Sequence, residues 1–257
     1  MKTNAIIRIV IYSIVILLLI SMLFVGLLIG ARLFQIDFGG DHITGEGTVA
    51  AEEIKNLQID WAAGSINIVT ADTKTITFTE EGYGDENDRM TYSQRGNTLK
   101  ISYSKPGIQI GFTSLPSKDL TITVPKDWVC AELELDGASL DICINGLNVK
   151  EFDIDGASNT IDFTGSFNSL SCDGASCKMN IVCINKPSEI DMDGAACSLT
   201  LTLPQDCGFQ VQLEGLSCDF NSDFDYTGSN GSYSYGDRHC KIDADGISYE
   251  IDIRKGE

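Results

Sequence analysis

The residues with the clearest chemical potential are four acidic residues that recur in one short motif. Asp136, Asp155, Asp173 and Asp193 each begin a segment Asp-Gly-Ala-Ser or Asp-Gly-Ala-Ala, at intervals of 19, 18 and 20 residues. A degenerate fifth copy, Glu214-Gly215-Leu216-Ser217, follows. If the copies stack, their carboxylates form a column that either belongs to the turns themselves or binds a hard cation such as calcium.

A structural turn is the simpler interpretation. An aspartate side chain accepts hydrogen bonds from nearby backbone amides in a turn, and glycine tolerates positive φ. We therefore interpret the pairs Asp136-Gly137, Asp155-Gly156, Asp173-Gly174 and Asp193-Gly194 as turn residues. Calcium remains the alternative for these aspartates. The chain has no Gly-Gly-x-Gly-x-Asp repeat and no EF-hand loop, so we predict no metal and no cofactor.

Nine cysteines offer thiol chemistry. Cys172, Cys177, Cys197 and Cys218 fall in apolar columns of the repeat, which favours small interior side chains. A disulfide between adjacent coils is the alternative for these residues, because stacked coils lie about 4.8 Å apart. Five others fall outside the clear interior columns and could supply one or two pairs: Cys130, Cys143, Cys183, Cys207 and Cys240. Their spacing does not fit a zinc site, and an odd count leaves at least one thiol free.

Catalytic groups are scarce. His42 lies in a linker, and His239 is adjacent to Cys240, so the two side chains would point apart in a strand. Carboxylate pairs suited to glycoside hydrolysis are present, but they belong to the regular repeat. We predict that the protein is not an enzyme, with hydrolysis of envelope polysaccharide as the alternative.

The elements that position these residues are β-strands. Aligned on the acidic residue, apolar side chains alternate with polar ones on both sides of each corner, as at Leu133, Leu135, Ile142 and Ile144. Period-two alternation indicates strands with one buried face. A repeat of about 20 residues with two such strands predicts an all-β fold, a parallel β-solenoid with two strands per coil. Looser turns such as Asn145-Gly146 close each coil.

The chain divides into four parts. Residues 1–8 form a cytoplasmic stub, 9–31 a transmembrane helix, 32–50 a juxtamembrane linker and 51–257 an extracytoplasmic β-repeat domain. Ile9 to Ile29 carries no charge and would span about 30 Å as a helix, and the basic residues favour a cytoplasmic N-terminus. A cleaved signal peptide is the alternative.

Two insertions interrupt the repeat. Residues 71–130 are predicted as an antiparallel meander, with strands near 75–79, 90–93, 98–104 and 120–124. Residues 221–240, rich in Gly, Ser and Tyr, are predicted as a loop or hairpin before the last coil. Several aromatic residues could form a binding lip or cap the end of the solenoid: Trp61, Tyr83, Phe112, Phe224, Tyr226, Tyr233 and Tyr235.

The corners, the segment Leu120-Thr121-Ile122-Thr123-Val124-Pro125-Lys126 and the segment Tyr233-Ser234-Tyr235-Gly236-Asp237 resemble a family of bacterial β-strand-repeat domains of unknown function, named as adhesin candidates. The resemblance covers roughly residues 50–257. It implies a structural repeat with no catalytic residues, and in some members a membrane anchor beside envelope-stress regulators.

The net charge of −19 and the pI of about 4.3 disfavour nucleic acid as a partner, since phosphate binding needs basic patches. Basic proteins or peptides and cations remain compatible with this charge. We predict a non-catalytic, adhesin-like interaction module at the cell surface, held in the membrane by residues 9–31 and accessory to envelope-stress sensing. Its protein or envelope partner is not specified by the sequence, and a cation-binding surface component is a further alternative.

Overall fold

The computed structural model describes residues 42–84, 86, 88–104 and 116–256. These residues form a 16-stranded sheet and one short 3₁₀ helix, η1 (Ala51–Glu53). The strands are β1 (Ile43–Thr44), β2 (Gly47–Ala50), β3 (Asn56–Asp60), β4 (Ala63–Ala71), β5 (Thr75–Glu81), β6 (Thr91–Arg95), β7 (Thr98–Ser102), β8 (Lys118–Pro125), β9 (Val129–Ser166), β10 (Ser169–Cys183), β11 (Glu189–Leu203), β12 (Phe209–Glu214), β13 (Ser217–Ser222), β14 (Thr227–Ser229), β15 (Ser232–Tyr235) and β16 (Cys240–Lys255). The prediction of an all-β domain is confirmed.

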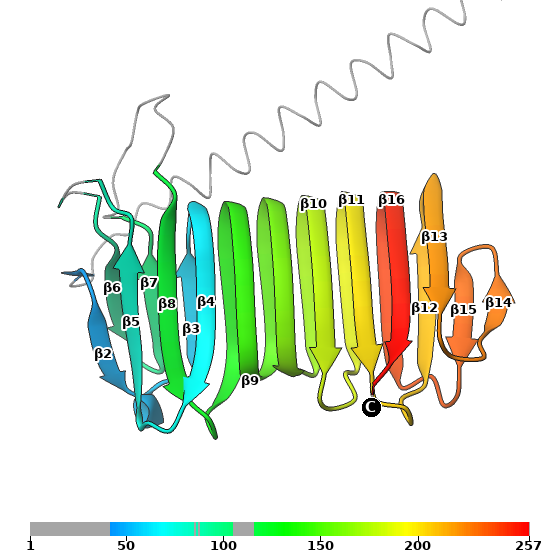
Figure 1. Ribbon diagram of the computed structural model, residues 1–257, viewed down its shortest axis with the longest axis horizontal. Coiled ribbons are helices and arrows are strands. Elements are labelled where there is room, and N and C mark those ends of the chain that lie inside the picture. Colours follow the sequence, from blue (N-terminus) through cyan, green and yellow to red (C-terminus); the bar gives the residue numbers. More distant parts are fainter. Residues whose placement is uncertain (1–41, 85, 87, 105–115, 257) are drawn as a thin grey trace, which may run out of the picture. The chain divides into compact units, whose positions relative to one another are not determined.

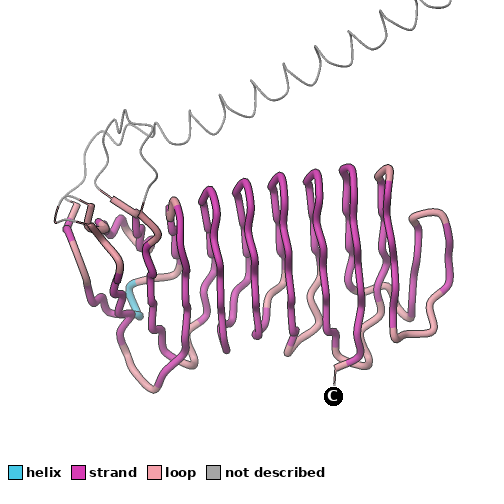
Figure 2. The backbone as a smooth tube through the Cα atoms, turned by 45° about the horizontal axis from the view of Figure 1, so that its top comes forward, coloured by secondary structure: helices cyan, strands magenta, loops and turns pink. Residues whose placement is uncertain are grey.

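The repeats stack as parallel coils (Figures 1 and 2). β10 pairs in parallel with β9 on one side and β11 on the other, and β11 pairs in parallel with β16. Equivalent residues meet in register, as in Phe152, Leu170, Ile190 and Ile242. These apolar columns are buried between the two arms of each coil. This arrangement is consistent with a β-solenoid, although each coil such as β10 is one continuous strand bent at its corner.

The corner glycines are required by crowding between coils, and the predicted reason, positive φ, is wrong. None of Gly137, Gly156, Gly174 or Gly194 has positive φ. A Cβ at Gly174 would lie 2.4 Å from the carbonyl oxygen of Gly156, and a Cβ at Gly194 would lie 2.3 Å from that of Gly174. Real Cβ atoms do not approach an oxygen so closely. Glycine therefore lets adjacent backbones meet where the strand bends.

The alanines that follow the corner glycines face solvent. Ala138, Ala157, Ala175 and Ala195 are exposed. In the coils nearest the C-terminal end of the stack their column is occupied by Ile247, 54% exposed, and Leu216, 90% exposed. The bend turns this position outward, so its small size is not imposed by core packing.

Residues 71–130 do not form one antiparallel meander, although strands occur at all four predicted places. β7 pairs in parallel with β3, and β8 pairs in parallel with β4, so these two strands make a further coil. β6 then pairs antiparallel with β7, and β5 with β8. The parallel pairs arise because the buried columns of β7 and β8 continue those of β3 and β4, for example at Leu99 and Ile122.

The spatial order of the last coils differs from their order in the sequence. β16, the last strand, lies between β11 and the pair β12 and β13. The predicted hairpin in residues 221–240 is present as β14 and β15, and β15 pairs antiparallel with β12. Figure 1 shows this hairpin at the end of the stack, beyond β12. Along the chain it precedes the last coil strand, β16, as predicted, and in space it pairs with β12 at the end of the stack.

The predicted transmembrane helix, residues 9–31, and the stub before it lie outside the described residues. Within the described ranges, no helix combines the length and apolar character needed to cross a bilayer.

Candidate functional site

The repeated acidic residues form a column along the corner of the stack. The register aligns Asp60 with Asp136, Asp155 with Asp173, Asp173 with Asp193, Asp193 with Asp245, and Asp245 with Glu214. β9 contributes two of these coils. Its second coil lies against its first, as the corner shows: a Cβ at Gly156 would lie 2.5 Å from the carbonyl oxygen of Gly137. All seven acidic residues therefore share one edge of the solenoid.

This corner column continues into an acidic surface on the arm that precedes it. The outward residues of that arm alternate with the buried columns, as Glu151 and Asp153 alternate with Phe152 and Ile154. We call this surface, together with the corner column, the acidic face. Its outward arm residues include seven further acids: Glu132, Glu134, Glu151, Asp153, Glu189, Asp191 and Asp243.

The opposite face, on the arm after each corner, carries fewer acids. Its outward positions in β9 and β10 hold uncharged residues and Lys178 beside Asp141 and Asp162. On the acidic face the basic side chains in the paired coil strands are Lys100, whose Nζ lies 2.7 Å from Asp60 Oδ2, and Lys241. β13 and β16 add Asp219, Glu250 and Asp252 to the opposite face, so the acidic face carries more acids without holding all of them.

Burial and the crowding of like charges raise the pKa of two carboxyl groups on the acidic face. Burial, followed by the charges of Glu151 and Asp155, raises the pKa of Asp153 above its ordinary value. Burial, followed by Asp193 and Asp243, likewise raises the pKa of Asp191. These carboxylates are therefore held in the charged form against an unfavourable potential at neutral pH.

Mild acid should stabilise the domain. Because Asp153 and Asp191 have a higher pKa when folded than when unfolded, the folded chain binds more protons between the two values. The gain is complete below the ordinary pKa of aspartate and is lost as the pH rises through the raised pKa. We expect the Tm at low salt to be higher at about pH 5 than at about pH 7.

Thermal melts of wild type and of Asp153→Asn/Asp191→Asn measure this effect. The variant should show a smaller rise in Tm on acidification, since two of the responsible carboxylates are gone. A Tm that falls between pH 7 and 5 by the same amount in both proteins would contradict the expectation.

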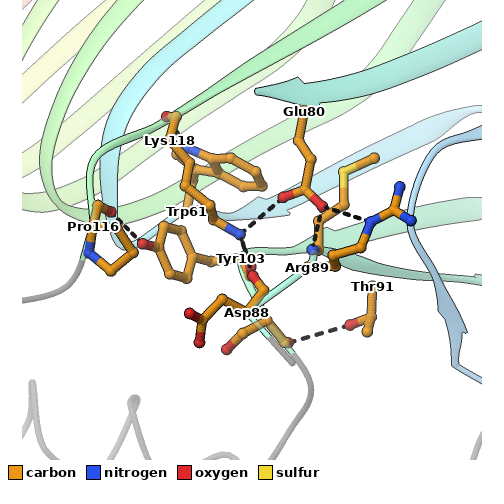
Figure 3. Close-up of polar contacts among 10 residues, drawn as sticks. Trp61, Glu80, Asp88, Arg89, Thr91, Tyr103, Pro116 and Lys118 are labelled. Atoms are coloured by element: carbon orange, nitrogen blue, oxygen red, sulfur yellow. Dashed lines mark hydrogen bonds and ion pairs between the residues drawn. The ribbon is translucent and has the colours of Figure 1, made fainter. Parts of the chain in front are cut away.

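A second cluster, of buried polar side chains, lies between β5 and β8 (Figure 3). The side chains of Lys118 and Glu80 are fully buried, and Lys118 Nζ lies 2.9 Å from Glu80 Oε2. The ammonium also donates to the carbonyl oxygen of Asp88 at 2.7 Å and to that of Tyr103, and it lies 3.9 Å from the centroid of the Tyr103 ring. Burial lowers the pKa of Lys118, while the ion pair with Glu80 opposes this shift.

Hydrogen bonds tie this ion pair to the surrounding strands. Glu80 Oε1 accepts from the backbone N–H of Met90 at 2.7 Å, and Trp61 Nε1 donates to the carbonyl oxygen of Lys118 at 3.0 Å. The Tyr103 hydroxyl donates to the carbonyl oxygen of Pro116. The cluster therefore joins β5, β8 and the segments on either side of residues 105–115. Its complete burial is typical of a structural ion pair rather than of a site that meets substrate.

Our sequence interpretation missed this cluster, although a signal for it was present. Lys118 lies in phase with Leu120, Ile122 and Val124, and Glu80 lies in phase with Ile76 and Phe78. Period-two alternation thus places both charges on the buried side of their strands. Two opposite charges at inward positions of neighbouring strands predict a buried ion pair.

Residues 54–181 match the family described as Toastrack DUF4097. The chain carries a Toastrack DUF4097 domain. The matched residues begin just before β3 and end within β10, so they include the parallel coils from β3 to β10, three of the four regular corners and the Lys118–Glu80 cluster. A search of curated proteins gave no match.

Several solved structures are similar to this chain. A candidate cell adhesion protein from Clostridium sporogenes has 15% identity and a TM-score of 0.49, covering 83% of this chain and 100% of that one. A candidate adhesin from Bacteroides fragilis has 12% identity and a TM-score of 0.30, covering 84% and 98%. A candidate lipid-binding protein from Parabacteroides distasonis has 15% identity and a TM-score of 0.29, covering 85% and 98%.

The cysteines of this chain form no disulfides in the structure, and most are buried. Cys172, Cys177 and Cys197 occupy the core as predicted, and Cys218 is half-buried. The expectation that the other five lie outside the interior is wrong for four of them: Cys130, Cys183, Cys207 and Cys240 are buried. Cys130 and Cys240 lie at the starts of β9 and β16, Cys183 ends β10, and Cys207 lies in the turn before β12, so the neighbouring turn sequences obscured their inward positions. Cys143 is exposed on the opposite face.

The aromatic residues form a cap, which decides between the two interpretations offered. Phe224, Tyr226, Tyr233 and Tyr235 pack on one another and on Phe209 and Phe220, with the Phe220 and Tyr233 rings stacked at 4.3 Å. Trp61 is fully buried at the other end and cannot contribute to an exposed lip. Tyr83 is 37% exposed, and Phe112 lies outside the described residues.

The candidate calcium ligands Asp136, Asp155, Asp173 and Asp193 lie in the corner column, one from each coil. Across the described part of the chain, no group of three or more His, Cys, Asp or Glu side chains is placed to hold a metal ion. Calcium takes six to eight oxygen ligands, so a column with one carboxylate per coil would need water for most of the coordination shell.

Proposed function

We propose that this Toastrack domain is a non-catalytic interaction module whose acidic face binds a basic protein or peptide at the cell surface. The observation that carries the proposal is the in-register acidic face, with a carboxylate at the corner of every coil from β3 to β12. Parallel pairing fixes the rise between these carboxylates at about 4.8 Å. The surface is therefore a rigid, regularly spaced array of negative charge.

Such an array favours long-range attraction of a basic partner. Clustered charge of one sign raises the association rate with an oppositely charged molecule, and salt weakens that attraction. Hydrogen bonding along the whole stack holds the backbone of the acidic face in place. Little conformational freedom is therefore lost when a partner binds. The proposal includes attachment by residues 9–31, with the domain outside the membrane as an accessory of envelope-stress sensing. Its support is the uncharged segment Ile9 to Ile29.

Intact cells that produce the full chain test both parts of the proposal. A membrane-impermeant maleimide should label Cys143, the exposed thiol, and so show that the domain is outside. A fluorescent oligolysine peptide should then bind these cells more strongly than cells without the chain, with binding that falls as salt rises.

The matched variants decide whether the acidic face is responsible. Asp153→Asn/Asp191→Asn/Asp243→Asn removes three charges from the acidic face and should weaken oligolysine binding about tenfold at low salt. Asp141→Asn/Asp162→Asn/Asp219→Asn removes three from the opposite face and should have little effect. Equal loss in both variants would reduce the effect to net charge and contradict a specific face. Release of sugars from envelope polysaccharide, abolished by the first variant, would instead favour the glycan-hydrolase alternative.

A further inference from the structure

Two buried cysteines lie in contact across one corner of the acidic face. Cys172 occupies the last inward position before the corner Asp173–Ser176, and Cys177 occupies the first inward position after it. Their Sγ atoms are 2.8 Å apart, with the Cys172 thiol donating toward Cys177. Two thiol sulfurs at this separation are within van der Waals contact and need only a small adjustment to bond.

We propose that Cys172 and Cys177 are a dithiol that oxidises to a disulfide across the corner by exchange with a small-molecule or protein disulfide. This goes beyond the proposed function, because it assigns a covalent modification to one coil of the stack. The bond would join the two arms of β10 beneath Asp173. It would therefore fix one carboxylate of the acidic face in its place.

The position of this pair within the coil is specific to β10. The equivalent positions hold Ile154 and Asn159 in the coil before, and Met192 and Cys197 in the coil after. The packing that brings the two side chains together is thus common to all coils, while the pair of thiols occurs in one. Cys197 lies beside Cys177 in the next coil, but no disulfide joins these two.

The exchange balances in two steps. The Cys177 thiolate attacks the oxidant's disulfide, releases one thiol and forms a mixed disulfide. The Cys172 sulfur then attacks Cys177 Sγ, loses its proton and displaces the second thiol. One disulfide in the oxidant becomes two thiols as the two cysteine thiols become one disulfide.

Burial determines when the exchange happens. Cys172 is 1% exposed and Cys177 is 2% exposed, so an oxidant cannot reach them in the closed stack. The bond therefore forms during folding, and the packed coil then protects it from reductants. This step requires a compartment that supplies disulfides, and so in the cell it rests on the proposed outer location.

Peptide mass mapping tests the pair. The full chain, unfolded in urea, is refolded into detergent with reduced and oxidised glutathione, blocked with N-ethylmaleimide under denaturing conditions and digested with trypsin. The peptide from Glu151 to Lys178 contains Cys172 and Cys177 and no other cysteine. We expect this peptide to lack two hydrogen atoms and to take no label before reduction and two labels after it.

The labelling patterns separate the outcomes. Two labels on this peptide before reduction would overturn the proposal, as would a bond from Cys177 to Cys197, which lies on the following peptide. In Cys172→Ser the peptide should take one N-ethylmaleimide label, at Cys177, before reduction. In Cys197→Ser the disulfide between Cys172 and Cys177 should still form. The same mapping is applied to a chain whose thiols are blocked directly in cells. If Cys172 and Cys177 are free thiols there but form the disulfide on refolding, the result would contradict the outer location and support the disulfide between Cys172 and Cys177.

Discussion

Substitution of Gly194 with alanine is expected to destabilise the folded domain by about 3 kcal/mol. The new Cβ would lie 2.3 Å from the carbonyl oxygen of Gly174 and 2.7 Å from Cys197 Sγ. Both neighbours are held by packed coils, so the clash forces the coils apart at a corner. Alanine also restricts the unfolded chain, which offsets about 0.4–1 kcal/mol of this cost.

Urea unfolding of wild type, Gly194→Ala and Ala195→Ser measures the effect. Ala195 is the next residue of the same corner and is exposed, so a serine there should change stability little. Gly246→Ala should match or exceed the loss at Gly194, because its Cβ would lie 1.8 Å from the carbonyl oxygen of Gly194. If Gly194→Ala were as stable as Ala195→Ser, crowding between coils would not explain the corner glycines.

Replacement of Lys118 with methionine is expected to cost about 3–5 kcal/mol. The substitution removes the buried cation of Glu80, whose carboxylate keeps only the longer contact with Arg89 Nε at 3.7 Å. It also removes the donor to the carbonyl oxygens of Asp88 and Tyr103. An uncompensated buried charge is far more costly than the net loss of one ordinary hydrogen bond. Methionine retains most of the volume of lysine, so the cost measures charge and hydrogen bonding more than a cavity.

The partner variant separates the ion pair from packing. Glu80→Gln keeps an acceptor for the Met90 N–H and removes the charge. In Lys118→Met/Glu80→Gln the buried ammonium and carboxylate are both removed, and Arg89 keeps Glu86, whose Oε2 lies 3.6 Å from its Nη1. The double variant should therefore be more stable than the sum of the single losses predicts. Lys186→Met, which breaks an exposed ion pair with Asp206, serves as the control and should change stability little. Equal effects of Lys118→Met and Lys186→Met would show that the buried pair contributes no special stability.

Local patterns in the sequence correctly predicted the strands and the sides on which their residues lie. Alternation around each corner placed Ile154 and Cys172 in the core and Asp153 on the surface, as found. The same pattern extends to Lys118 and Glu80, whose charge led us to overlook them. In contrast, the role of the corner glycines depends on the distance to the neighbouring coil. A single coil contains no information on that distance, and so its sequence suggested positive φ instead.

The sequence by itself determined the repeating coil, its buried columns and the acidic column at its corner, because these depend on residue spacing within one unit. Only the tertiary structure decided the order in which the coils stack. β16 could follow β13 on repeat pattern alone, but it lies beside β11, where the Tyr249 hydroxyl is 3.0 Å from the carbonyl oxygen of Met192 and 3.2 Å from that of Gly194. Neighbouring coils present nearly identical backbone edges, so the choice between them depends on such side-chain contacts between residues distant in sequence.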